Sequence, residues 1–91
     1  MGERRSQYEI YWEILTFCKT GKSFTAIINR CDLNSKTGQW YLEFLFGKGY
    51  LTRIKEGEKT TYTATGKAAD YITLFSRLYL SVFDEIPGFK L

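Results

Sequence analysis

The stretch "LNSKTGQWYLEFLFGKGYL", residues 33–51, most constrains how this chain can fold. Its apolar residues recur at helical spacing, and Asn34 or Ser35 can cap the helix because a short polar side chain accepts a bond from a free backbone N–H. The helix closes in Gly-Lys-Gly, and Tyr50-Leu51 then begins a strand. The sequence therefore predicts a helix that passes almost directly into a strand.

Two further helices are expected before this one. "SQYEIYWEILTFCKTG" opens with Ser6 and Glu9, the spacing of a capping box. Gly21 is expected to end this helix in the left-handed C′ conformation. "KSFTAIINRCDL" predicts a short second helix capped by Ser23, with a break at 32–34 before the third.

After the third helix, "YLTRI" and "TTYTAT" are suited to strands, and the charged "KEGEK" between them predicts a hairpin turn. Thr65-Gly66 then opens a long last helix, at roughly 66–85. Three helices, the second and third joined by a tight turn, followed by a hairpin and a helix, predict a winged helix-turn-helix, an α+β and mostly α fold. We expect one compact unit, with the winged helix-turn-helix at 1–65 and a dimerisation helix and tail at 66–91.

The charge distribution favours a phosphate-facing surface in the first two thirds of the chain. Residues 1–67 hold eleven Lys and Arg against seven Asp and Glu, within a net charge of +3 for all 91 residues. No apolar run approaches the length of a membrane span, and the first residues lack the apolar segment of a secretory signal. We therefore expect a cytoplasmic protein without a membrane partner.

The sequence offers little chemistry for an enzyme. It has no histidine, no glycine-rich phosphate loop after a strand, and no Ser or Cys next to a base, so we expect neither catalysis nor a cofactor. Cys18 and Cys31 are too few for a zinc site and are interpreted as buried thiols, with a disulfide left open. No feature of the sequence indicates a small-molecule ligand.

The third helix and the hairpin carry the candidate DNA-binding residues. At about 100° per residue, Lys36, Gln39, Trp40, Glu43 and Gly47 face away from the expected core side of Gly38, Tyr41, Leu42 and Leu45. The outward face of such a helix enters the major groove of DNA, and the hairpin or a basic N-terminal arm can reach the phosphates. The candidates are Asn34, Ser35, Lys36, Thr37, Gln39, Trp40, Arg53, Lys55, Lys59, Thr60, Arg4 and Arg5.

The assignment of Trp40 has alternatives. Trp40 can contact a sugar or a thymine methyl, or it can cover a neighbouring element or a second subunit. With Phe44 it can also form a docking surface for a protein partner. Glu43 argues mildly against deep insertion because a carboxylate is repelled by phosphates unless it accepts from cytosine N4.

The last helix carries a seam with the 4-3-4 spacing of a coiled coil. A second apolar stripe, Tyr71, Leu74 and Leu78, runs beside it. One stripe can pack on the first helix, and another copy of so small a protein is the expected cover for the other. The residues assigned to the dimer interface are Ala68, Ile72, Phe75, Tyr79, Val82 and Ile86.

The segments "EIYWEIL", "LNSKTGQWYLEFLFGKGYL" and "YTATGKAADYI" together resemble the small archaeal winged-helix DNA-binding proteins that dimerise through a C-terminal helix. The resemblance covers about residues 6–80, and the sequence departs from the pattern at Gly38, Trp40, Phe44 and Gly47. It implies abundant, often weakly sequence-specific binding of double-stranded DNA by a homodimer. The implied role is that of a nucleoid-associated chromatin protein or a transcription regulator.

Overall fold

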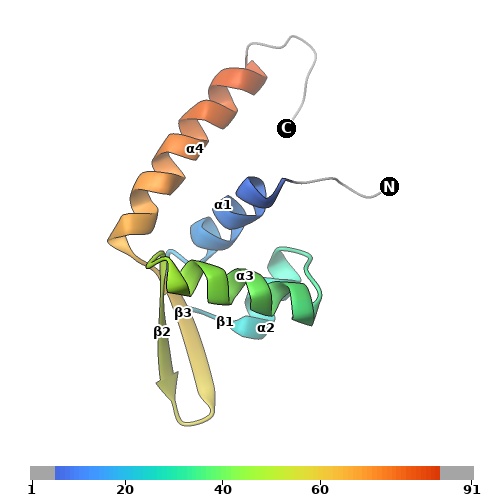
Figure 1. Cartoon of the computed structure of the whole chain (residues 1–91), viewed down its shortest axis with the longest axis vertical. Helices are drawn as coiled ribbons and strands as arrows, with labels where there is room; N and C mark the ends of the chain where they lie inside the picture. The colour runs from blue at the N-terminus through green and yellow to red at the C-terminus, as the bar shows by residue number, and fades with distance from the viewer. Residues whose placement is uncertain (1–5, 85–91) are drawn as a thin grey trace.

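The computed structural model describes residues 6–84, with side chains described through residue 78. Helices and strands follow one another as α1 (Gln7–Phe17), β1 (Lys22–Ser23), α2 (Phe24–Arg30), α3 (Ser35–Gly47), β2 (Leu51–Glu56), β3 (Lys59–Ala64) and α4 (Gly66–Asp84). The hairpin leaves one end of α3 in one direction, and α4 leaves the same end in the opposite direction and rises past α1 (Figure 1). The predicted α+β, mostly helical fold with three helices, a hairpin and a last helix is confirmed.

The sheet contains one strand that the sequence did not predict. Its order is β1-β3-β2, and β2 pairs with β3 in antiparallel register from Leu51 opposite Ala64 to Glu56 opposite Lys59. The additional strand, β1, pairs its two residues with Tyr62 and Thr61. Two residues are too few to show an alternating pattern, so β1 leaves no signal in the sequence.

The expectation that Gly21 ends the first helix in a left-handed conformation is wrong. Helix α1 ends at Phe17 with Cys18 as its C-cap, and the described glycines with positive φ are Gly49 and Gly57. Gly21 instead lies against β3, where a Cβ atom would be 2.5 Å from Cγ2 of Thr61. The glycine therefore permits the close approach of the chain to β3 just before β1 begins.

The helix starts follow the predicted caps. Ser6 and Glu9 form a complete capping box, and Ser23 accepts a bond from the backbone N–H of Ala26. Asn34, one of the two candidates, caps α3. Each of these side chains satisfies a backbone N–H that has no partner within the first helical turn.

One apolar core joins the three N-terminal helices, the sheet and the start of α4. It consists of Ile10, Tyr11, Ile14, Leu15, Cys18, Ile27, Cys31, Leu42, Leu45, Leu51, Tyr62, Ala68 and Ile72. Both cysteines are free and buried. Burial, followed by the proximity of Cys31, raises the pKa of the Cys18 thiol to about 12, so this thiol stays protonated near neutral pH.

Candidate nucleic-acid interface

The turn between α2 and α3 holds the two helices in close contact. Asp32 adopts a left-handed conformation with a φ of 58°, and the backbone N–H of Leu33 donates to the carbonyl of Ile28 at 2.9 Å. The left-handed Asp32 and this hydrogen bond end α2, whose last residue is Arg30. Gly38, buried in the first turns of α3, lies against Ile28, whose side chain occupies the space that a Cβ atom would need. A larger residue at position 38 would separate α3 from α2.

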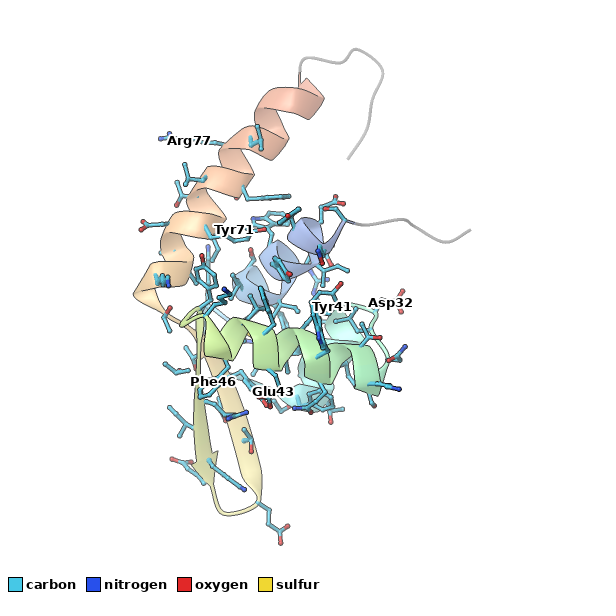
Figure 2. All side chains as sticks on the ribbon, in the orientation of Figure 1. Asp32, Tyr41, Glu43, Phe46, Tyr71 and Arg77 are labelled. Carbon is cyan, nitrogen blue, oxygen red and sulfur yellow. The ribbon has the colours of Figure 1, made fainter. Side chains whose placement is uncertain are left out.

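The outward face of α3 agrees with the helical periodicity of the sequence. Gly38, Leu42 and Leu45 are buried and Tyr41 is half-buried. Lys36, Gln39, Trp40, Glu43 and Gly47 are all exposed. Helix α3 therefore presents an outward stripe of exposed, mainly polar side chains. The hairpin extends away from the C-terminal end of this helix (Figure 2).

The N-terminus of α3 offers backbone donors as well as side chains. Asn34 Oδ1 accepts from the Thr37 N–H at 2.8 Å, and the Gly38 N–H makes the first intrahelical bond, to the Asn34 carbonyl, at 2.8 Å. The N–H groups of Ser35 and Lys36 precede that bond and have no intrahelical acceptor. These two residues are exposed, as an anion-binding helix terminus requires.

Glu43 is held by two donors from different elements. Gln39 Nε2 donates to Glu43 Oε2 at 2.9 Å, and Arg53 of β2 forms a salt bridge to the same oxygen at 2.8 Å. The guanidinium carbon of Arg53 lies 4.0 Å from the centroid of the Phe46 ring. Figure 2 shows Glu43 and Phe46 on the side of α3 next to the hairpin.

This network sets the electrostatics of the outward face. The interaction of Arg53 with Tyr62, followed by its interaction with Glu43, raises the pKa of Arg53, so the guanidinium remains charged. The Arg53 charge offsets that of Glu43, which reduces the repulsion that this carboxylate would otherwise exert on a phosphate. Phe46, which sequence reasoning missed, supports the guanidinium through its ring face.

The remaining wing candidates lie toward the tip of the hairpin. Lys55 and Lys59 are exposed and Thr60 is half-buried, while Gly57 takes a positive φ of 64° in the turn. Glu56 and Glu58 are also exposed, so the tip has both signs of charge. The predicted contacts of Arg4 and Arg5 lie outside the described residues.

Trp40 is both a packing residue and an exposed one. One face of its ring stacks on Phe44, with centroids 5.6 Å apart and planes at 8°, and the ring makes a T-shaped contact with Tyr41. Phe44 stacks in turn on Tyr11 of α1 at 5.3 Å. Trp40 remains 55% exposed. It therefore covers a neighbouring aromatic side chain and keeps a surface free for a partner.

The predicted dimer seam on α4 lies partly on the core side of the protomer. Ala68 and Ile72 are buried in the core, and the ring of Phe75 lies 5.7 Å from that of Trp12 on α1. Residues buried within the protomer cannot contact a second subunit in this conformation. The side chains of Tyr79 and Val82, and the whole of Ile86, lie outside the described part of the structure.

The exposed apolar residues of α4 belong to the other stripe. Leu74 is 64% exposed and Leu78 is 63% exposed. The 4-3-4 spacing identified the apolar stripe that contains Ala68 and Ile72, but α1 packs against that side of α4. A hydrogen bond from Trp12 Nε1 to Ser76 Oγ at 3.0 Å holds α1 and α4 together there. Among the described residues of α4, Leu74 and Leu78 are therefore the large apolar side chains available to a partner.

Helices α3 and α4 meet at a bonded segment that sequence reasoning also missed, here called the α3–α4 junction (residues 48–50 and 65–67). Gly49 has a φ of 84°, and the Tyr50 N–H returns to the Leu45 carbonyl at 2.9 Å, which completes a Schellman motif. Thr65 Oγ1 donates to the Gly49 carbonyl at 2.7 Å, and Lys67 Nζ donates to the Lys48 carbonyl at 2.9 Å. The end of α3 and the start of α4 are thus fixed to each other.

A winged helix-turn-helix family model matches residues 4–80. The chain belongs to the winged helix-turn-helix family. An uncharacterised protein of Methanocaldococcus jannaschii is 34% identical over 77 residues, which are 84% of this chain and 72% of that protein. Membership of this family agrees with the expectation that the chain is not an enzyme.

Solved structures show the same fold. Sso10a-2, a DNA-binding protein from Sulfolobus solfataricus, superposes with a TM-score of 0.77 at 25% identity over 88% of this chain and 87% of its own. The transcriptional regulator BldR from the same organism gives 0.70 at 15% identity over 88% of this chain and 63% of its own. A homodimeric winged helix-turn-helix DNA-binding domain from Mycobacterium bovis gives 0.63 at 21%, over 81% and 68%. The resemblance to archaeal winged-helix DNA-binding proteins is therefore confirmed.

The described residues hold no cluster of metal ligands and no helix that could span a membrane. No group of three or more His, Cys, Asp or Glu side chains within 6–84 is arranged to hold a metal ion. No helix in that part of the chain is both long and apolar enough to cross a membrane.

Proposed function

We propose that this protein is a homodimer that binds double-stranded DNA, with α3 in the major groove and the hairpin on the backbone. It acts either as an architectural chromatin protein or as a transcription regulator, and it is associated with the nucleoid in the cytoplasm. The observation that carries the proposal is the exposed polar face of α3, which the Arg53–Glu43 salt bridge joins to the hairpin. Sso10a-2 is a DNA-binding protein and BldR a transcriptional regulator, and these two relatives support the two forms of the role.

The residues of this face have separate roles in the proposed complex. The N–H groups of Ser35 and Lys36, with Asn34 and Thr37 beside them, contact a phosphate at the N-terminus of α3. Lys36, Lys55, Lys59, Thr60 and Arg53 add contacts to the backbone. Gln39 is suited to read adenine, because its bond to Glu43 engages one of two N–H donors and an amide also has an acceptor oxygen.

The proposed dimer forms through α4. Leu74 and Leu78 form the exposed apolar surface described for this helix, and a second copy would remove it from water. A two-fold dimer presents two α3 helices, so contacts on DNA should repeat at about one helical turn, roughly 34 Å, or at a multiple of it. The homodimeric relative from Mycobacterium bovis supports this assembly.

The test is a titration of a random-sequence duplex at several salt concentrations, with sedimentation of the complex alongside. Binding should weaken linearly in log salt. Lys36→Ala and Lys59→Ala should each weaken binding and lower the salt slope by about one in the units of that plot. Lys19→Ala, an exposed lysine outside α3 and the hairpin, is the matched control and should change neither quantity.

The exposed Trp40 favours one other candidate function, a protein-interaction module that uses Trp40 and Phe44. A comparison of duplex binding by Trp40→Ala with duplex binding by the two lysine variants distinguishes the two functions. If both lysine variants bind duplex as tightly as the parent, the groove model is wrong. If the parent binds no duplex even at low salt, the Trp40 surface becomes the leading site.

A further inference from the structure

A pocket of about 260 Å³ lies between α1, α3, α4 and the turn that joins α3 to β2. These elements come from distant parts of the chain, and α1 and α4 lie on the same side of α3 (Figure 1). The pocket is lined by Tyr8, Tyr11, Leu15, Phe44, Leu45, Lys48, Tyr50 and Tyr71. None of these eight described residues is acidic, and Lys48 is the one with a formal charge.

Aromatic rings form two walls of this pocket. On the side of α1 and α3, Tyr11 stacks on Phe44, and Tyr8 contacts Tyr11 edge-on at 5.9 Å. On the other side, the rings of Tyr50 and Tyr71 lie 6.1 Å apart. A space lined in this way suits a flat apolar ring, which gains both buried area and ring contacts.

The α4 side of the pocket is fixed in place. Tyr71 points from α4 toward α1 (Figure 2), and its hydroxyl donates to the carbonyl of Tyr8 at 2.6 Å. Burial, with smaller effects from neighbouring tyrosines, raises the pKa of Tyr71 to about 12. The hydroxyl therefore stays neutral at physiological pH, and the wall that it forms does not repel an anion.

Two ammonium groups lie above the aromatic walls. Lys48 Nζ is 5.6 Å from the centroid of Phe44, and Lys67 Nζ is 5.2 Å from the centroid of Tyr50. The bond from Lys67 Nζ to the Lys48 carbonyl keeps the two lysines together. The pocket thus combines an apolar aromatic interior with positive charge at its edge.

We propose that this pocket binds a small aromatic carboxylate, with its ring between the tyrosine and phenylalanine side chains and its carboxylate on Lys48. The 260 Å³ volume lies just below the range of about 300–1,000 Å³ usual for drug-sized ligands, which limits the ligand to one or two fused rings. The site uses neither the outward residues of α3 nor the hairpin. Ligand binding at this site can therefore be tested independently of DNA binding.

The first experiment compares 2-naphthoate with its neutral analogue 2-naphthamide by calorimetric titration of the full chain. The carboxylate should bind at least tenfold more tightly, because a hydrogen bond between two charged groups is stronger than one to a neutral amide. In ¹H–¹⁵N spectra, 2-naphthoate should shift the amide signals of Lys48, Tyr50 and Tyr71. No binding of 2-naphthoate at millimolar concentration, or shifts confined to other residues, would overturn the proposal.

The second experiment tests the role of Lys48. Lys48→Met retains an unbranched side chain without the charge at an exposed position, so the fold should be unchanged. This variant should lose about tenfold in affinity for 2-naphthoate and bind 2-naphthamide as the parent does. Lys55→Met, the same change on the hairpin, should bind both compounds like the parent. Equal affinity of the parent and Lys48→Met for 2-naphthoate would show that the carboxylate site is wrongly assigned.

Discussion

Helices α3 and α4 each bury one side in the same core, yet their exposed sides differ in kind. On α3, Gln39 donates to Glu43, and Glu43 also accepts from Arg53 of the hairpin. On α4, Leu74 and Leu78 project into solvent. The α3 surface is polar and its side chains are already oriented, which suits a hydrated polyanion. The α4 surface is apolar, so its natural partner is another apolar surface.

The largest expected effect is on the oligomeric state. Leu74→Glu combined with Leu78→Glu should raise the dissociation constant of the proposed dimer at least 100-fold, because each change would place a charge in the proposed apolar contact on both subunits. Both side chains are mostly exposed in the protomer, so its fold should be retained. Sedimentation equilibrium, with circular dichroism as the check on folding, measures the change.

Ile54→Glu is the matched control for this pair of changes. Ile54 is 50% exposed but lies on the hairpin, so its substitution should leave the dimer intact. Dimerisation that survives the α4 changes would remove α4 as the interface.

A smaller effect is expected when one negative charge is removed from α3. Glu43→Gln should increase affinity for duplex DNA by roughly 3- to 10-fold at low salt, because the repulsion of the phosphates falls and Arg53 gains freedom to contact them. Asp70→Asn makes the same change in charge on an exposed part of α4 and should alter affinity much less. Fluorescence anisotropy with a labelled duplex measures both variants. Weaker binding by Glu43→Gln would instead indicate that Glu43 contacts a base.

The smallest expected effect is on the pH dependence of the free energy of unfolding, through Tyr71 on the inner side of α4. The pKa of Tyr71 is raised from 10.0 to about 12 by burial, then by Tyr11, Tyr50 and Tyr8. The folded state therefore holds this proton more tightly than the unfolded state does. The stability that this provides is complete below about pH 10 and is lost as the pH rises from 10 toward 12.

Urea unfolding between pH 8 and 11 tests this effect through the slope of stability against pH. Tyr71→Phe should lose less stability on going from pH 10 to 11 than the parent does, whatever the cost of the lost bond to Tyr8 at neutral pH. Identical slopes for the parent and Tyr71→Phe would show that Tyr71 does not contribute.

Much of the fold could be predicted because its signals are local. The caps at Ser6, Ser23 and Asn34, the closing Gly-Lys-Gly and the hairpin turn each depend on residues adjacent in sequence. The outward face of α3 follows from helical periodicity alone. The role of Gly21 was predicted wrongly because glycine is needed there for a close approach to Thr61, which lies forty positions away in the sequence.

The candidate sites were harder to predict because they depend on which elements pack together. Periodicity found two apolar stripes on α4, but only the position of α1 decides that the stripe with Ala68 and Ile72 is internal. The salt bridge of Glu43 with Arg53 joins a helix to a strand through side chains with no local pattern. The pocket beside Lys48 likewise draws its lining from three helices and from the turn that follows α3.

The α3–α4 junction has a mechanical consequence for the proposed dimer. Because Thr65 and Lys67 bond to the end of α3, a rotation of α4 would turn α3 with it. The 19 residues of α4 make a rod about 28 Å long, so a 10° change of its angle moves the far end by about 5 Å. That displacement exceeds one base-pair step of about 3.4 Å. The angle at which two α4 rods cross would therefore set the phase of the two α3 helices along the DNA.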